Sequence, residues 1–128
     1  MKFGLKQYTL DYFFNKVLEK YPNNPAISSV GETPIIYNEF GEKVYKLQAT
    51  LKALGIRKGD KIIIIGNSSP NWAISFMAIM TMGAVAVPVL EGFPESDIEH
   101  IIRHSEAEGI FISNILHSTL NLELEDMK

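Results

Sequence analysis

The apolar positions in the second half of the chain gather into three short runs without polar alternation. The clearest comprises residues 62–65, which are four consecutive isoleucines. A strand that is apolar on both faces belongs in a parallel sheet that is covered on both sides. Residues 84–89 and 109–113 have the same character. We therefore expect three buried strands in this half of the chain.

Helical patterns separate these runs. Ser69 and Pro70 are typical of an N-cap and a first helical position, and Gly83 ends the helix that they begin. Pro94, followed by acidic residues, is expected at the first position of the next helix. The inner face of that helix carries Ile98, Ile101 and Ile102. The order from residue 61 onward is βαβαβ, which predicts an α/β fold with parallel-sheet layers and flanking helices.

The first part of the chain predicts a helix and a hairpin. Thr9 can cap a helix that runs to about Tyr21. Two short strands are expected at residues 26–30 and 33–37. A two-residue link at 31–32 that contains glycine indicates a tight hairpin between them.

A second helix is expected from about Asn38 to Leu54. Its apolar residues recur in steps of three and four and form one stripe. Gly55 follows at the position of a helix-ending glycine. Ile36 stands where a capping serine or threonine would be favourable, so we expect Asn38 to cap this helix instead.

Composition and charge narrow the range of functions. The chain has 128 residues, a formal net charge of −3 and no cysteine. Its charges are scattered, whereas a nucleic-acid surface needs a clustered basic stripe, so we expect no nucleic-acid partner. The lack of cysteine excludes disulfides and thiol nucleophiles and agrees with a cytoplasmic location. Polar residues, glycine and proline interrupt the apolar stretch 72–90, which predicts a buried helix and strand and no transmembrane segment.

The loop from Asn67 to Asn71 is the first candidate site. It follows a predicted parallel strand and precedes a helix, a place where α/β folds often bind anions. A turn with a helix cap explains the same residues, and we favour that interpretation.

Two other polar groups are weaker candidates. His100 and His104 have the spacing of a metal-binding pair on a helix, but no cysteine or third histidine lies nearby in the sequence. We expect a solvated helix face there and assign no metal. Glu91 and the acidic residues near 95–99 are expected to act as first-turn helix charges with no acid–base role.

Five motifs follow one another in order along the chain. They are Tyr37-Asn38-Glu39-Phe40, Ala53-Leu54-Gly55-Ile56-Arg57-Lys58-Gly59-Asp60-Lys61 with the run of isoleucines after it, Asn67-Ser68-Ser69-Pro70-Asn71-Trp72, Met82-Gly83-Ala84-Val85-Ala86-Val87-Pro88, and residues 98–104 with Ser105-Glu106-Ala107. The series resembles the opening domain of AMP-forming acyl-CoA synthetases, most of all the long-chain fatty acid CoA ligases. The resemblance extends over residues 9–113, and it rests on the order of the motifs because none of them is diagnostic alone.

The resemblance implies the chemistry of that family. Its members join a carboxylate to ATP with Mg²⁺, release pyrophosphate, and exchange AMP for the thiol of coenzyme A. The Ser/Thr/Gly-rich loop ending in Pro-Lys, the metal ligands and the catalytic lysine of the family would lie beyond residue 128. We therefore expect an inactive fragment without catalytic, cofactor-binding or metal-binding residues of its own. ATP, Mg²⁺, coenzyme A and a fatty acid would be partners of the full-length parent.

The same resemblance suggests how the chain is organised. Residues 1–113 would form a partial N-terminal domain, and residues 114–128 a polar tail where the chain is truncated. In the parent enzyme an acyl tunnel could be lined by Trp72, Phe76, Met77, Met80 and Met82. Helical spacing of such residues is more often plain core, and we favour core here.

Two other functions stay open. The chain could be a free-standing α/β binding or interaction module without catalysis, or part of an adenylation domain for another carboxylic acid. A partial domain would expose apolar surface and favour self-association. The parent would be cytoplasmic, with peripheral contact at the membrane as a further option.

Overall fold

A three-stranded parallel sheet lies at the centre of the structure. The computed structural model describes residues 4–119. The middle strand is β3 (Lys61–Ile65), which lies between β4 (Val85–Val89) and β5 (Gly109–Ile112) and runs parallel to both. The predicted α/β class and the predicted parallel sheet are therefore confirmed.

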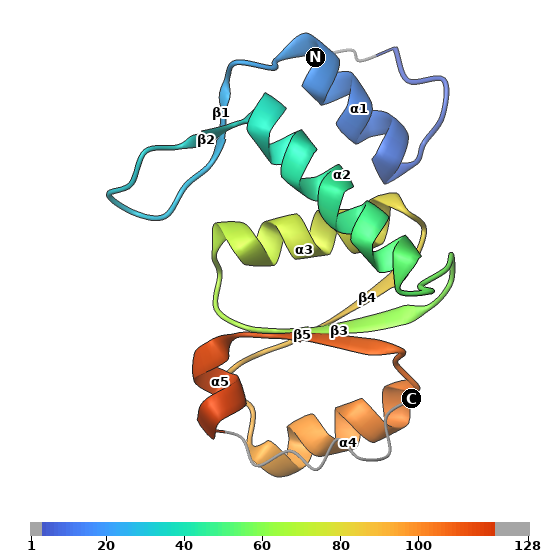
Figure 1. Ribbon diagram of the computed structural model, residues 1–128, viewed down its shortest axis with the longest axis vertical. Helices are drawn as coiled ribbons and strands as arrows, with labels where there is room; N and C mark the ends of the chain where they lie inside the picture. The colour runs from blue at the N-terminus through green and yellow to red at the C-terminus, as the bar shows by residue number, and fades with distance from the viewer. Residues whose placement is uncertain (1–3, 120–128) are drawn as a thin grey trace.

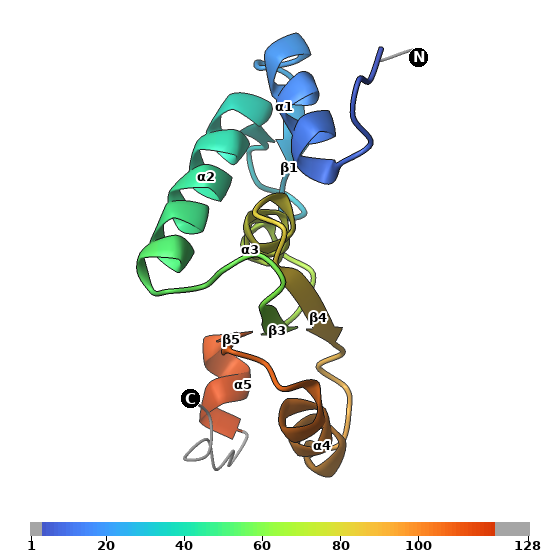
Figure 2. The same cartoon turned by 90° about the vertical axis from the view of Figure 1, so that its right-hand side faces the viewer.

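Helices cover both faces of this sheet. In Figure 1, α3 (Pro70–Thr81) lies on one face, and α4 (Glu95–Ser105) and α5 (Asn114–Thr119) lie on the other. Figure 2 shows the same layers from the side. Two further helices, α1 (Leu10–Lys20) and α2 (Tyr37–Ala53), pack over α3 as an outer layer. No helix within the described residues is both long enough and apolar enough to cross a membrane.

The four isoleucines of β3 fill two separate cores. Ile62 and Ile64 belong to the cluster on the α3 side of the sheet, whereas Ile63 and Ile65 belong to the cluster on the α4 side. All four are at most 2% exposed. Because successive side chains of a strand point to opposite faces, an uninterrupted apolar run is needed to fill both cores. Burial of each isoleucine is worth about 1.5–3 kcal/mol, which explains why this run forms the central strand.

Two helix ends form as the sequence predicts. The hydroxyl oxygen of Thr9 accepts a hydrogen bond from the backbone N–H of Tyr12 at 3.2 Å and caps α1. At the end of α3, Gly83 has a φ of +79°, a left-handed conformation that glycine adopts without steric cost.

The predicted two-residue hairpin is wrong. The paired strands β1 (Pro25–Ile27) and β2 (Ile35–Ile36) are antiparallel but short, and the intervening residues 28–34 form a loop that projects from the molecule in Figure 1. Pro34 has no N–H to donate to a strand ladder. Val30 is fully exposed and gains nothing from an extended pairing. Pairing is therefore confined to the residues next to α2.

The predicted cap of α2 is also wrong. The helix begins at Tyr37, its N-cap is Ile36, and no side chain caps it. Carbonyl groups of the loop between α1 and β1 take over this role. The backbone N–H of Tyr37 donates to the carbonyl of Asn24 at 3.0 Å, and that of Asn38 donates to the carbonyl of Pro22 at 2.8 Å. The free N–H groups of a helix start need some acceptor, and here a long-range backbone contact supplies it.

The boundaries of the last two helices differ in detail from the predicted ones. Pro94 is the N-cap of α4, one position before its predicted place. Beyond the other end of α4, Glu106 takes a φ of +56°, a conformation that more often falls to glycine. The stretch expected to be a polar tail begins with α5, and residues 120–128 lie outside the described residues.

Candidate functional site

The carboxyl ends of β3 and β5 form a crevice because the chain leaves these neighbouring strands toward opposite faces. After β3 it enters α3 on one face of the sheet, and after β5 it enters α5 on the other (Figure 1). The cores agree, since Leu116 of α5 packs against the cluster that contains Ile63 and Ile65, whereas residues of α3 belong to the cluster that contains Ile62 and Ile64. Open α/β sheets bind their ligands at such topological switch points. The fold therefore points to this edge of the sheet.

A cleft of about 410 Å³ opens at this edge. Its size lies within the range of about 300–1,000 Å³ that is typical of small-molecule sites. The lining comes from both strand ends and both helix starts, and comprises Ile64, Ile65, Gly66, Asn67, Ser69, Asn71, Trp72, Ser75, Phe111, Ile112, Ser113 and Asn114.

The hydroxyl groups at the cleft hold the two helix starts in place. Ser69 Oγ accepts a hydrogen bond from the backbone N–H of Trp72 at 3.2 Å. Ser113 Oγ accepts one from the N–H of Leu116 at 3.4 Å, and Ser75 Oγ donates to the carbonyl oxygen of Asn71 at 2.8 Å. The favoured interpretation, a turn with Ser69 as the helix cap, is confirmed. Anion binding by this loop was the less favoured interpretation and stays an untested alternative.

Comparison with known proteins assigns the chain to a family. The family model of the AMP-binding enzymes matches residues 14–127. The chain belongs to the AMP-binding enzyme family. Long chain acyl-CoA synthetase 4 of Arabidopsis thaliana is 33% identical over 110 residues, which cover 77% of this chain and 16% of that protein. Salicyl-AMP ligase / salicyl-S-ArCP synthetase of Mycobacterium tuberculosis is 24% identical over 111 residues, which cover 84% of this chain and 20% of that protein.

A solved structure shares the fold. The anthranilate CoA ligase AuaEII in complex with anthranoyl-AMP superposes with a TM-score of 0.83 at 20% identity, over 98% of this chain and 24% of the other. The parallel sheet and its flanking helices are therefore those of the N-terminal portion of AMP-binding enzymes. The chain spans less than a third of the length of each of these relatives.

The described residues that line the cleft offer no charged side chain to a nucleoside triphosphate and its Mg²⁺, which AMP-binding enzymes use. No lining residue within the described part of the chain has an ionisable side chain. Bound Mg²⁺ needs carboxylates, and phosphate groups are usually held by arginine or lysine. Residues 4–119 also contain no group of three or more His, Cys, Asp or Glu residues able to hold a metal ion. The chemistry of the lining fits an uncharged group, so we assign no step of ATP handling to these residues.

Of the residues predicted for an acyl tunnel, Trp72 alone lines the cleft. Its indole stacks on the ring of Phe76, with centroids 5.3 Å apart and an angle of 9° between the planes. Phe76, Met77 and Met82 pack against the core on the α3 side of the sheet. The remaining residue of that prediction, Met80, is half-buried outside the cleft lining. The structure thus leaves Trp72 as the aromatic side chain of α3 that can meet a ligand.

The other candidate side chains lie elsewhere. His100 and His104 are exposed on α4, as the expected solvated face requires. Glu91 is exposed in the turn after β4. None of the three lines the cleft.

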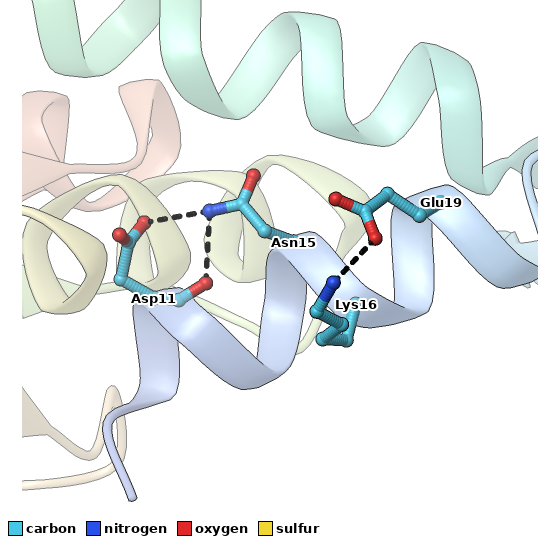
Figure 3. A network of polar contacts seen from close by, with 4 residues as sticks. All are labelled: Asp11, Asn15, Lys16 and Glu19. Carbon is cyan, nitrogen blue, oxygen red and sulfur yellow. Dashed lines mark hydrogen bonds and ion pairs between the residues drawn. The ribbon is translucent and has the colours of Figure 1, made fainter. Parts of the chain in front are cut away.

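A polar network on α1 contains ionisable groups but has a structural explanation. Figure 3 shows Asn15 donating to the carbonyl and the carboxylate of Asp11, at 2.9 Å and 3.3 Å. The same view shows Lys16 and Glu19 in an ion pair of 2.7 Å, which raises the pKa of Lys16. On the neighbouring helix α2, Tyr45 donates to Asp11 at 2.9 Å, and burial together with this bond raises the pKa of Tyr45 to about 12. The bond from Tyr45 to Asp11 joins α1 to α2, the other contacts lie within α1, and none of these residues lines the cleft.

Sequence reasoning missed the β5 side of the cleft. Phe111, Ser113 and Asn114 line it, although they were not candidates for a site. The available signal was their place at the carboxyl end of a predicted parallel strand. Without the strand order, that signal does not say which other strand end they face.

Proposed function

We propose that this chain is the N-terminal part of an ATP-dependent long-chain fatty acid CoA ligase. The proposal is carried by the 33% identity with a long chain acyl-CoA synthetase over 110 residues. In the reaction, a carboxylate oxygen of the fatty acid attacks the α-phosphorus of ATP and pyrophosphate leaves. The thiol sulfur of coenzyme A then attacks the acyl carbon of the adenylate, and AMP leaves as the thioester forms.

Within this proposal, the cleft serves the acyl group of the substrate. Its lining combines Trp72 and Phe111 with neutral amides and hydroxyls, a surface that suits an apolar chain or ring better than a charged group. Trp72→Ala in the full-length enzyme should raise KM for the acid at least several-fold and leave KM for ATP unchanged. Ser68→Ala, an exposed neighbour outside the lining, is the matched control. If Trp72→Ala changed the KM for the acid and the KM for ATP equally, the assignment of the cleft to the acyl group would be contradicted.

The reaction is tested by acid-dependent exchange of pyrophosphate into ATP. The assay compares the product of the complete reading frame that contains these residues with the 128-residue chain alone. We expect exchange with palmitate for the long product, formation of palmitoyl-CoA when coenzyme A is added, and no exchange for the short chain. Exchange by the short chain, or no exchange by the long product with any acid, would contradict the proposal.

A second candidate is adenylation of another carboxylic acid. The match to salicyl-AMP ligase / salicyl-S-ArCP synthetase at 24% identity over 84% of this chain supports it. The same assay separates the two candidates, with salicylate, anthranilate and phenylalanine offered beside palmitate. Exchange with one of these acids and not with palmitate would favour the second candidate.

Self-association and location belong to the same proposal. The large apolar side chains of Tyr8, Val30, Leu54, Leu90 and Ile115 are each more than two-thirds exposed, which supports association through apolar surface. Light scattering should therefore give a mass above that of a monomer at high concentration, and a constant monomer mass would contradict self-association.

We place the enzyme in the cytoplasm, with peripheral contact at a membrane. Fractionation of cells that express the full-length protein tests this placement.

A further inference from the structure

Three asparagine side chains that line the cleft keep their hydrogen-bonding groups available to a ligand. Asn67 lies in the loop after β3, Asn71 in the first turn of α3, and Asn114 at the start of α5. The hydrogen bonds at the cleft join serine hydroxyls to backbone groups, and within residues 4–119 none of them involves the carboxamides of these asparagines. All three residues are exposed, so water reaches their amides. Each amide therefore offers two N–H donors and one carbonyl acceptor.

The serine hydroxyls of the lining are already used within the protein. Ser69 and Ser113 accept hydrogen bonds from backbone N–H groups of α3 and α5, and Ser75 donates one to a backbone carbonyl of α3. The asparagine amides, in contrast, come from the segments that follow two neighbouring strands, β3 and β5, and line one cleft from both sides. A few polar groups placed in this way are what fixes the orientation and the specificity of a ligand in a small-molecule site.

A plain hydrocarbon chain is a poor partner for these amides. It would displace water from them and return no hydrogen bond, which disfavours binding for each polar group that loses its partner. A hydroxyl group on the chain replaces the displaced water, because it can donate one hydrogen bond and accept two. One such hydrogen bond is worth roughly two- to tenfold in affinity.

We propose that the acyl chain bound in this cleft carries a neutral hydrogen-bonding group, and that Asn67, Asn71 and Asn114 select for it. The preferred substrate is a long-chain fatty acid with a hydroxyl group on its chain, whose hydrocarbon part contacts Trp72 and Phe111. No ionisable side chain lines the cleft within the described residues, so a charged substituent gains no ion pair there. The inference rests on the proposed ligase function and on the assignment of the cleft to the acyl group.

The test compares matched acids in the full-length enzyme. Acid-dependent exchange of pyrophosphate into ATP is measured with palmitate and with 3-, 10- and 16-hydroxyhexadecanoate, which carry the hydroxyl group near the carboxylate, midway along the chain and at its end. We expect the kcat/KM for at least one hydroxylated acid to exceed that for palmitate by about tenfold, mainly through a lower KM.

Substitution of the amides tests which residues select the hydroxyl group. The triple variant Asn67→Leu, Asn71→Leu and Asn114→Leu keeps side chains of similar size without donors or acceptors. It should lower the ratio of kcat/KM for the hydroxylated acid over palmitate to about one. Asn23→Leu makes the same change at an exposed asparagine outside the lining and should leave the ratio unchanged. Circular dichroism checks that each variant folds, and the three single variants, of which at least one should lower the ratio, replace the triple variant if it does not.

The possible outcomes separate this inference from the ligase function. A kcat/KM for palmitate that equals or exceeds that of every hydroxylated acid would overturn the inference and leave the ligase function standing. A hydroxyl preference that survives the loss of the three amides would also overturn it, since another part of the enzyme would then recognise the hydroxyl group. No exchange with any acid would contradict the ligase function, and this inference with it.

Discussion

One buried hydrogen bond fixes how α2 packs on α3. Gln48 Nε2 donates to Thr81 Oγ1 at 2.9 Å, and the Thr81 hydroxyl donates in turn to the carbonyl of Met77 at 2.6 Å. Lys52 supplies the amide oxygen of Gln48 with a donor at 3.0 Å. Gln48 is 9% and Thr81 8% exposed, so water cannot easily replace a lost partner. The bond therefore offers a direct test of this helix contact.

Removal of both partners should cost less than the sum of the two single removals. Thr81→Val keeps the shape of the side chain but leaves the Gln48 amide without its acceptor, at a cost of about 1–3 kcal/mol. Gln48→Met leaves the Thr81 hydroxyl bonded to Met77 and should cost about 0.5–1.5 kcal/mol. The double variant buries no unpaired group there, so its loss should be smaller than the sum of the single losses by at least about 1 kcal/mol.

Urea denaturation followed by circular dichroism measures these free energies of unfolding. Thr50→Val is the matched control, since Thr50 bonds to the carbonyl of Lys46 on the exposed side of α2. That control should change stability by no more than about 0.5 kcal/mol. If Thr81→Val behaved like Thr50→Val, or if the two core substitutions were additive, the reasoning about the buried bond would be refuted.

Three further predictions concern a titrating group, a cap and the central strand. Burial raises the pKa of Tyr45 from 10.0 to about 12, so the unfolded chain loses the phenol proton first and stability should fall between about pH 10 and pH 12. Denaturation curves at increasing pH should show a smaller fall in the free energy of unfolding for Tyr45→Phe. An unchanged fall would contradict its assignment to the Tyr45 phenol. Ser69→Ala removes the cap of α3 and should lower stability by about 1 kcal/mol. Ser68 is exposed and caps no helix, so Ser68→Ala should leave stability unchanged, and equal urea midpoints of the two variants would contradict the prediction. Ile63→Ala, at a fully buried site, should cost about 2–5 kcal/mol in the same assay, against little for the fully exposed Val30→Ala, and similar losses would contradict the two-core description of β3.

The elements that the sequence predicts well are those with local causes. Ser69 and Pro70 carry a complete start signal within two residues, and Gly83 ends the same helix because a left-handed residue is needed there. The four consecutive isoleucines of β3 indicate a strand that is buried on both faces. These features depend on neighbours in the chain, so the pattern of residues is enough to find them.

The elements that the sequence predicts poorly depend on distant partners. The start of α2 has no capping side chain, because the carbonyls of Pro22 and Asn24 accept hydrogen bonds from its N–H groups. No pattern of neighbouring residues predicts such a contact. Glu106 adopts a left-handed conformation after α4 although its side chain gives no sign of it.

The cleft is an intermediate case, because the strand order that creates it could have been inferred. Pro88 lies in β4 and has no N–H for a second neighbour, so β4 belongs at an edge of the sheet. The isoleucines of β3 require cover on both faces and favour the central position. β5 must then lie on the far side of β3, and right-handed crossovers in opposite directions place α3 and α4 on opposite faces. The carboxyl ends of β3 and β5 therefore form a switch point, which brings Ser113 and Asn114 opposite Asn67 and Trp72. What the sequence does not supply is the shape of the cleft, which depends on how the two aromatic side chains Trp72 and Phe111 pack.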